Sequence, residues 1–328
     1  MSRHLNGTRH CCFEGGFEVF HAVFWCSKSS QHLFSLVLLA TMGLDLTWST
    51  IEMSQINELK PLSVGNGTVI CAMDNRGVGQ VTLNRPQVNN AYNGDMIAGL
   101  HEAMDQLGQQ TGLRVVVLKG NGAHFQAGAD LAWINEQGKL GPEQNVAASR
   151  ATGHAVRRLN ELPVPTVAMI QGGCFGGGTG IAAACDVVVA ADNAMFAITE
   201  ARWGLVAGII FPQLIQAIGL RNLRRYALTC ERINAERAQQ MGFVHEVCAL
   251  EALEETTFAI VESLLKSAPQ ATADTKRLTL SLADALLEDT LFEDLAGRHA
   301  RTRQSAEAAE GTQSFMQKRA PSWYTPKA

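Results

Sequence analysis

Short apolar runs alternate with amphipathic stretches through the middle of the chain. Val69–Met73 and Gly79–Leu83 are apolar runs joined by a turn-like Asp-Asn-Arg-Gly sequence, which predicts a β-hairpin. Residues 96–107 carry apolar side chains at the spacing of one helix face, which predicts an amphipathic helix. The largely apolar run Leu113–Leu118 then predicts a buried strand.

The same alternation continues to about residue 190. In order, the pattern predicts a helix near 144–160, a strand at Thr166–Ile170, a glycine-rich turn, a short helix at Ile181–Cys185 and a strand at Val187–Ala190. Strands separated by helices favour parallel pairing, because a parallel pair needs a crossover connection. The sequence therefore predicts an α/β core.

From about residue 250 onward the pattern changes, and Ala, Leu, Glu and Arg dominate as far as Arg303. No strand pattern survives there, so the segment is predicted to be helical. Its apolar stripes have little else in the chain to cover them, which indicates packing on another subunit. We expect a C-terminal helical oligomerisation region at 251–328, following an α/β core at 61–250.

The first sixty residues differ from the rest: they carry scattered Cys, His and Phe, and their hydrophobic positions follow no sustained helix or strand periodicity. The apolar run Leu33–Leu44 is about twelve residues, too short for a bilayer that needs about 20. It also lies too late for a secretory signal, and no basic amphipathic helix indicates mitochondrial import. We expect 1–60 to be a disordered extension, with 1–52 an over-extended gene start, and the protein to be cytoplasmic.

Composition narrows the class of protein. Of 328 residues, 46% are hydrophobic and 18% charged, which excludes disorder for the bulk of the chain. With a formal net charge of -4, the chain lacks the excess of basic residues that is typical of a nucleic-acid-binding protein. The eight Cys form no C-x-x-C motif, which favours free buried thiols over disulfides or a metal site.

Two glycine-containing segments, His124–Leu131 and Gln171–Gly180, carry the candidate chemistry. Each follows a predicted strand and places small residues where a helix starts, so that free backbone N–H groups point outward. Two such groups facing each other could bind a developing oxyanion. The spacing is neither the G-x-G-x-x-G of a dinucleotide loop nor the G-K-[ST] of a P-loop, although close helix packing alone also uses glycine.

Six segments together resemble the crotonase (enoyl-CoA hydratase/isomerase) superfamily. They are LNRP with Asn90-Ala91 (83–91), HFQAGADL (124–131), PVPTVAMIQGGCFGGG (163–178), ACDVVVAADNAMF (184–196), ERINAERAQQMGFV (231–244) and FMQKRAPSW (315–323). The resemblance covers about 65 to 325. It implies an α/β fold, a crotonase-like spiral of ββα units with a C-terminal helical region. Within the family the chain looks closest to the methylglutaconyl-CoA hydratase-like branch, which includes the isohexenylglutaconyl-CoA hydratases.

The resemblance also implies roles for single residues. Ala129 and Gly177 match the two backbone N–H donors that hold the thioester oxygen, and Glu200 matches one of two catalytic glutamates. The residues that match contacts to CoA are Ala127, Asp130, Leu131, Phe315 and Lys318. The family implies an acyl-CoA substrate, no separate cofactor, no metal, and a homotrimer or dimer of trimers without nucleic-acid or membrane partners.

The chain departs from the hydratase pattern at two places. The second glutamate of the pair would fall at Gly180, so a two-carboxylate mechanism cannot be carried over intact. Val206–Pro212 replaces the more usual Gly-Gly-Thr-Gln loop. The methylglutaconyl-like branch shares both departures. We expect Gly180 to leave room for a branched or carboxylated acyl chain, and Asp186 to anchor the strand it begins.

The leading expectation is therefore syn addition of water to an α,β-unsaturated acyl-CoA, with Glu200 handling the proton. A Δ3,Δ2-enoyl-CoA isomerase is the first alternative, because moving one proton from Cα to Cγ needs one carboxylate. A CoA-binding or RNA-associated protein with little catalysis is the second, supported by the missing glutamate at Gly180. The acyl chain itself cannot be read from the sequence.

Overall fold

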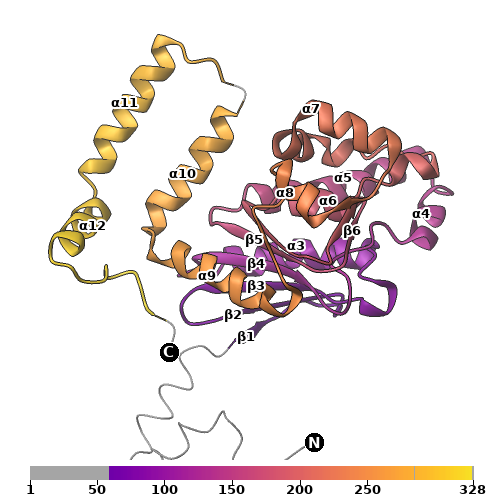
Figure 1. Ribbon diagram of the computed structural model, residues 1–328, viewed down its shortest axis with the longest axis horizontal. Helices are drawn as coiled ribbons and strands as arrows, with labels where there is room; N and C mark the ends of the chain where they lie inside the picture. Colours follow the sequence, from indigo (N-terminus) through magenta and orange to yellow (C-terminus); the bar gives the residue numbers. More distant parts are fainter. Residues whose placement is uncertain (1–58, 284, 327–328) are drawn as a thin grey trace, which may run out of the picture. The chain divides into compact units, whose positions relative to one another are not determined.

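The computed structural model describes residues 59–283 and 285–326, and the expectations for 1–58 lie outside them. A seven-stranded sheet forms the centre of this part of the chain (Figure 1). In spatial order its strands are β1 (Lys60–Leu62), β2 (Val69–Met73), β3 (Val78–Leu83), β4 (Val115–Gly120), β5 (Thr166–Ile170), β7 (Val187–Ala191) and β10 (Glu246–Cys248).

The pairing of these strands confirms the α/β interpretation. β2 and β3 form the predicted antiparallel hairpin, with Val69 opposite Leu83. From β3 onward the neighbours β3–β4, β4–β5, β5–β7 and β7–β10 are all parallel. The predicted strand at 166–170 has the same bounds in the structure, whereas β4 begins two residues later than expected.

A second, three-stranded sheet corrects the interpretation of the glycine-rich segment. β6 (Gly173–Phe175) pairs in parallel with β8 (Met195–Ala197), which pairs in antiparallel with β9 (Ile233–Asn234). We expected only a turn here, because glycine disfavours strands. Tertiary pairing decides instead, since Gln126 also bonds β6 through its backbone N–H and C=O.

Helices cover both faces of the large sheet. The helices before residue 250 are α3 (Gly94–Gly108), α4 (Leu131–Gln137), α5 (Pro142–Asn160), α6 (Gly177–Ala183), α7 (Phe211–Thr229) and α8 (Ala235–Gln240). α3 and α5 are the predicted helices, and the Asn93 side chain caps α3 by accepting from the Met96 N–H at 3.1 Å. The short helix α6 begins at Gly177 rather than at Ile181 as expected.

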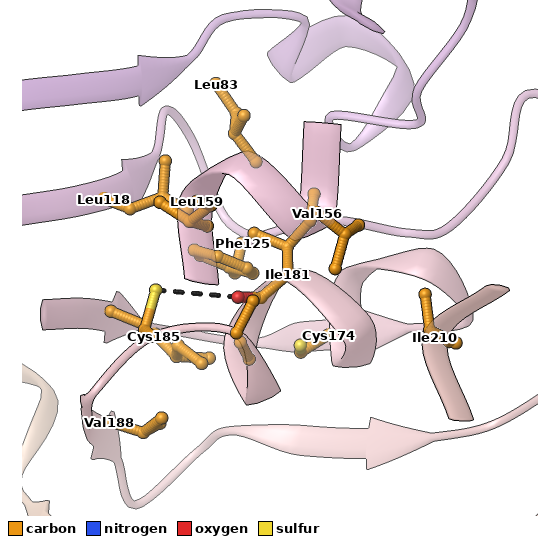
Figure 2. Packing of buried hydrophobic residues seen from close by; sticks show 14 of the residues in the cluster. Leu83, Leu118, Phe125, Val156, Leu159, Cys174, Ile181, Cys185, Val188 and Ile210 are labelled. Atoms are coloured by element: carbon orange, nitrogen blue, oxygen red, sulfur yellow. Dashed lines mark hydrogen bonds between the residues drawn. The ribbon is translucent and has the colours of Figure 1, made fainter. Parts of the chain in front are cut away.

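The core lies on the two sides of the sheet. Because side chains alternate along a strand, Val116 and Leu118 of β4 face one layer and Val115 and Val117 the other. The first layer joins α3, α5, α6 and α7 to the sheet. Figure 2 shows part of it, where Phe125 lies near Leu118 of β4 and Leu159 of α5. The second layer is built against α9 (Leu253–Lys266).

Helices also make up the end of the chain, as the pattern predicted. After α9 come α10 (Pro269–Leu282), α11 (Asp289–Arg303) and α12 (Ala306–Met316), and in Figure 1 α11 and α12 lie on the side of α10 away from the sheet. Lys276 of α10 ties this region to the core through Asp186, whose carboxylate lies 2.7 Å from the lysine Nζ. Asp186 also accepts hydrogen bonds from the N–H and hydroxyl of Thr166, so its predicted anchoring role is confirmed.

Within the described residues, four cysteines are buried and Cys248 is half-buried, and all five are free thiols. No helix in this part of the chain is long and apolar enough to cross a bilayer.

Candidate active site

A cavity of about 550 Å³ opens where the two glycine-containing segments meet. Its wall includes Ala129, Gly177 and Glu200, which come from three separate parts of the chain. Ala127 and Leu131, two of the five residues matched to CoA contacts, line the same cavity. The structure therefore gathers these five candidates around one space.

The Ala129 N–H faces away from the strand-like segment beside it. Tyr92 donates its N–H to Gly128 O at 2.8 Å and accepts from the Asp130 N–H at 2.8 Å, which makes a parallel bridge to Ala129. In such a bridge the residue between the two bonded neighbours directs its own N–H to the opposite side. Gly128 has a φ of 89°, the left-handed region that favours glycine, and this conformation turns the chain there.

The Gly177 N–H belongs to the first turn of α6. The first N–H groups of a helix have no carbonyl one turn earlier to bond with, so they point out of the helix end. Gly176, which precedes it, has a φ of 52° and donates its own N–H to Ala197 O at 2.8 Å. Because neither Gly176 nor Gly177 has a side chain, an oxyanion could approach this peptide and accept a hydrogen bond from the Gly177 N–H.

Glu200 begins the 3-10 helix η2 (Glu200–Trp203) and turns its carboxylate toward that peptide. A Cβ added to Gly176 would lie 3.0 Å from Glu200 Oε1, which places the carboxylate directly beside Gly176. Oε2 is buried and has no hydrogen-bond partner among the described residues. Burial raises the pKa of Glu200 above its ordinary value, although the backbone N–H groups of Glu200 and Thr199 act in the opposite direction.

Two free amides beside a half-buried carboxylate with one unpaired oxygen match the chemistry of thioester enolates, and the family comparison agrees. The enoyl-CoA hydratase/isomerase family model matches residues 73–326. The chain belongs to the enoyl-CoA hydratase/isomerase family. The predicted crotonase fold is thereby confirmed, and solved members of the family share it.

Several relatives show how far the likeness extends. An enoyl-CoA hydratase of Thermus thermophilus is 36% identical over 245 residues, covering 74% of this chain and 96% of its own. A crystallised enoyl-CoA hydratase of Shewanella pealeana superposes with a TM-score of 0.75 at 31% identity, covering 84% of this chain and 100% of its own. The structure of AtuE of Pseudomonas aeruginosa superposes with a TM-score of 0.74 at 34% identity, covering 79% of this chain and 100% of its own.

A further relative differs in the name of its reaction. The hydroxycinnamoyl-CoA hydratase-lyase of Pseudomonas fluorescens is 32% identical over 196 residues, covering 59% of this chain and 71% of its own.

Asp130, which matches a CoA contact, has a structural role in this chain, and its contact with CoA stays a prediction. It is not among the residues that line the cavity but is the N-cap of α4, where its carboxylate accepts from the Ala132 N–H at 3.0 Å. Arg85 donates to the same side chain at 3.1 Å. Burial alone would raise the pKa of Asp130, but these hydrogen bonds together lower it below its ordinary value. The residue holds together the loop that carries Ala129.

Phe315 and Lys318 lie at the end of α12, away from the cavity lining of the same chain. Phe315 is 85% exposed, and Lys318 adopts a left-handed backbone conformation just after the helix. A single chain does not bring these two residues to the other candidates, and their contact with CoA stays a prediction.

Gly180 corrects the expectation that the missing glutamate leaves room for the acyl group. A Cβ added to Gly180 would lie 2.2 Å from Ile210 Cγ2, and Ile210 is only 2% exposed. The space beside Gly180 is therefore filled by the Ile210 side chain of η3 (Gly208–Ile210). The two departures from the hydratase pattern, Gly180 and the Val206–Pro212 segment, therefore pack against each other, with Ile210 filling the volume beside Gly180.

The sequence did not single out Tyr92 or Trp133, which form an aromatic wall of the cavity. Their ring centroids lie 5.8 Å apart in an edge-to-face arrangement. The one available signal was the neighbouring Asn90-Ala91 motif, which places Tyr92 beside a family segment but carries no information on where its ring points.

Proposed function

We propose that this enzyme is a hydratase that adds water to an α,β-unsaturated acyl-CoA with a single carboxylate. One observation carries the proposal: the cavity combines two free backbone amides with one carboxylate that has a buried, unpaired oxygen. Glu200 is the only Asp or Glu among the described residues that line it.

The thioester oxygen would rest between the N–H groups of Ala129 and Gly177. Charge on this oxygen grows as the thioester becomes an enolate, so donors fixed in advance favour the transition state over the ground state. Removing one such donor typically costs about 3 kcal/mol of transition-state stabilisation. Both donors here are backbone groups of paired or helical residues, which holds them in place before substrate arrives.

Glu200 would move the proton in both halves of the reaction. Its carboxylate takes a proton from water as the water oxygen bonds Cβ, and the C=C electron pair moves toward the thioester oxygen. The neutral carboxylic acid then returns the proton to Cα as the enolate reverts to the thioester. The net result is one water added across the double bond, with Glu200 regenerated as the anion. Burial, which raises the pKa of Glu200, makes it a better proton acceptor.

The cavity wall supports an acyl chain larger than crotonyl. Apolar residues from α3, α5, α6 and η3 contribute to the wall: Ile97, Leu100, Val156, Ile181 and Ile210. Asn145, Ser149 and Thr152 of α5 add polar groups to the same space. We infer a preference for branched acyl chains that carry a polar end, of which 3-methylglutaconyl is an example.

Isomerisation of a 3-enoyl-CoA is the second candidate. The same lone carboxylate favours it, because transferring one proton along the chain requires no bound water and no second acid. A CoA-binding protein with little catalysis is the weakest of the three, since the buried, unpaired Oε2 of Glu200 costs stability and a binding site has no use for it.

The three candidates separate in one assay. Purified protein is supplied with crotonyl-CoA, 3-methylglutaconyl-CoA and a 3-enoyl-CoA, and products are identified by mass. Hydration of the branched substrate with a higher kcat/KM than crotonyl-CoA supports the proposal. Conversion of the 3-enoyl-CoA alone, without gain of water, points to the isomerase, and no turnover points to a binding protein.

We also propose that the chain assembles as a homotrimer or a dimer of trimers. Large apolar side chains stand exposed on and beside α10–α12, namely Leu286, Leu287, Phe292, Phe315 and Met316. Such residues favour a protein interface, and contact of Phe315 with CoA would then be made in the assembly. Light scattering at micromolar concentration is expected to give three or six chain masses, and a monomer would contradict the proposal.

A further inference from the structure

Tyr92 connects the two residues that supply the oxyanion amides. Its backbone is bridged to Ala129 through the hydrogen bonds described above. Its ring reaches Gly177, where an added Cβ would lie 2.6 Å from Tyr92 Cε1 and 3.3 Å from Cζ. Any side chain at position 177 would displace the ring, so glycine is required there by Tyr92 as well as by the approach of a substrate.

Tyr92 and Glu200 both lie close to the same peptide. The carboxylate of Glu200 stands beside Gly176, and the tyrosine ring lies on Gly177. The peptide between the two glycines carries the N–H that faces the thioester oxygen. A thioester bound to that N–H would therefore have both the carboxylate and the phenol ring close to it.

The hydroxyl of Tyr92 is available as a hydrogen-bond donor. Its hydroxyl has no partner among the described residues, although Tyr92 is half-buried and lines the cavity. Burial, and after it the negative charge of Glu200, raises the pKa of Tyr92 to about 12. The hydroxyl therefore keeps its proton at neutral pH and can donate a hydrogen bond to an anion.

We propose that the Tyr92 hydroxyl donates a third hydrogen bond to the thioester oxygen, beside the amides of Ala129 and Gly177. This makes Tyr92 a catalytic residue, and the inference rests on the proposed thioester chemistry. No bond forms or breaks at Tyr92, whose proton stays on the phenol while charge builds on the substrate oxygen. The third donor offsets what the site lacks at Gly180, where no second carboxylate assists the proton transfer.

The test compares Tyr92→Phe with the full-length wild type. The substitution keeps the ring that packs on Gly177 and Trp133 and removes only the donor. We expect kcat for the best substrate of the assay to fall about 100-fold, with KM changed little. The control Tyr324→Phe removes a hydroxyl that bonds Glu262 at 3.3 Å outside the cavity, and it should retain wild-type kinetics.

A spectroscopic readout separates oxygen polarisation from a structural role. 4-Dimethylaminocinnamoyl-CoA absorbs at longer wavelength when its thioester oxygen is hydrogen-bonded, because the amine donates electrons toward that oxygen. We expect a red shift on binding to wild type and to Tyr324→Phe, and a smaller shift in Tyr92→Phe. Incorporation of 3,5-difluorotyrosine at position 92, a stronger donor of the same shape, should enlarge the shift and serves if Tyr92→Phe does not fold.

An unchanged red shift in Tyr92→Phe, with or without loss of kcat, overturns the role of Tyr92 while leaving the hydratase proposal in place. A wild type that shows neither turnover nor red shift overturns the proposed function first, and Tyr92 with it. The two failures are therefore distinct.

Discussion

Replacing Glu200 by Gln should lower kcat by about 100- to 10,000-fold, the range that positioned acid–base groups contribute. The amide has the shape of the carboxylate but cannot accept the proton from water. Binding should persist, because the thioester oxygen is held by the Ala129 and Gly177 amides and not by Glu200. The measurement is single-turnover hydration beside a Kd for a saturated acyl-CoA, which should stay within about threefold.

The stability of the same variant provides an independent check. Burial raises the pKa of Glu200 in the folded chain, so the folded state binds its proton more tightly than the unfolded state. The ionised form therefore costs stability above the folded pKa, and this cost disappears below the unfolded value of about 4.3. The melting temperature of Glu200→Gln at pH 7 should therefore be no lower than that of the wild type, whereas replacing a residue that stabilises the fold would lower it.

A matched control is Glu136→Gln on α4, a glutamate close in sequence to the site that does not line the cavity. It should leave kcat unchanged within about twofold. Near-normal kcat in Glu200→Gln would remove Glu200 from the mechanism, whereas an equal loss in both variants would indicate a general defect of the protein.

Gly180→Glu is expected to destabilise the fold strongly. The first side-chain carbon would already overlap Ile210 Cγ2 at 2.2 Å, and overpacking a core typically costs about 1–3 kcal/mol. A buried carboxylate without a partner adds to that cost. Thermal and urea unfolding should show a clear loss relative to wild type, so the single variant is a poor test of whether a second glutamate aids hydration.

The double variant Gly180→Glu with Ile210→Gly removes the overlap. We expect it to be more stable than Gly180→Glu alone, which gives the pair a favourable coupling energy in a double-mutant cycle. If the glutamate then reaches the cavity, crotonyl-CoA hydration should rise relative to the branched substrate. Additive losses, with Ile210→Gly alone as the reference, would show that Ile210 does not occupy the space beside Gly180.

Much of the layering could be predicted from sequence because it follows local patterns. The hairpin, α3, β5 and the helical end are set by alternation and by helix periodicity, which neighbouring residues decide. β6 could not be predicted, because it exists only through pairing with Gln126 and with a strand about twenty residues later. The role of Asp130 as a cap has a signal in the sequence, because aspartate is favoured directly before the first residue of a helix.

The candidate site divides in the same way. Motif resemblance placed Ala129, Gly177 and Glu200 in advance, and the structure brings all three to one cavity. Resemblance could not show what fills the space left at Gly180, because Ile210 lies thirty residues away and meets it only in the fold. Tyr92 was missed for the same reason, since nothing local directs its ring onto Gly177.

The central claim is that a single half-buried carboxylate, Glu200, moves the proton. The pH dependence of kcat/KM for the preferred enoyl-CoA tests this claim most directly. Activity should fall as pH is lowered through the pKa of Glu200, which burial places above the ordinary glutamate value. The account predicts an acidic limb of slope one that is absent from the residual activity of Glu200→Gln. A limb of slope two, or the same limb in that variant, would contradict it.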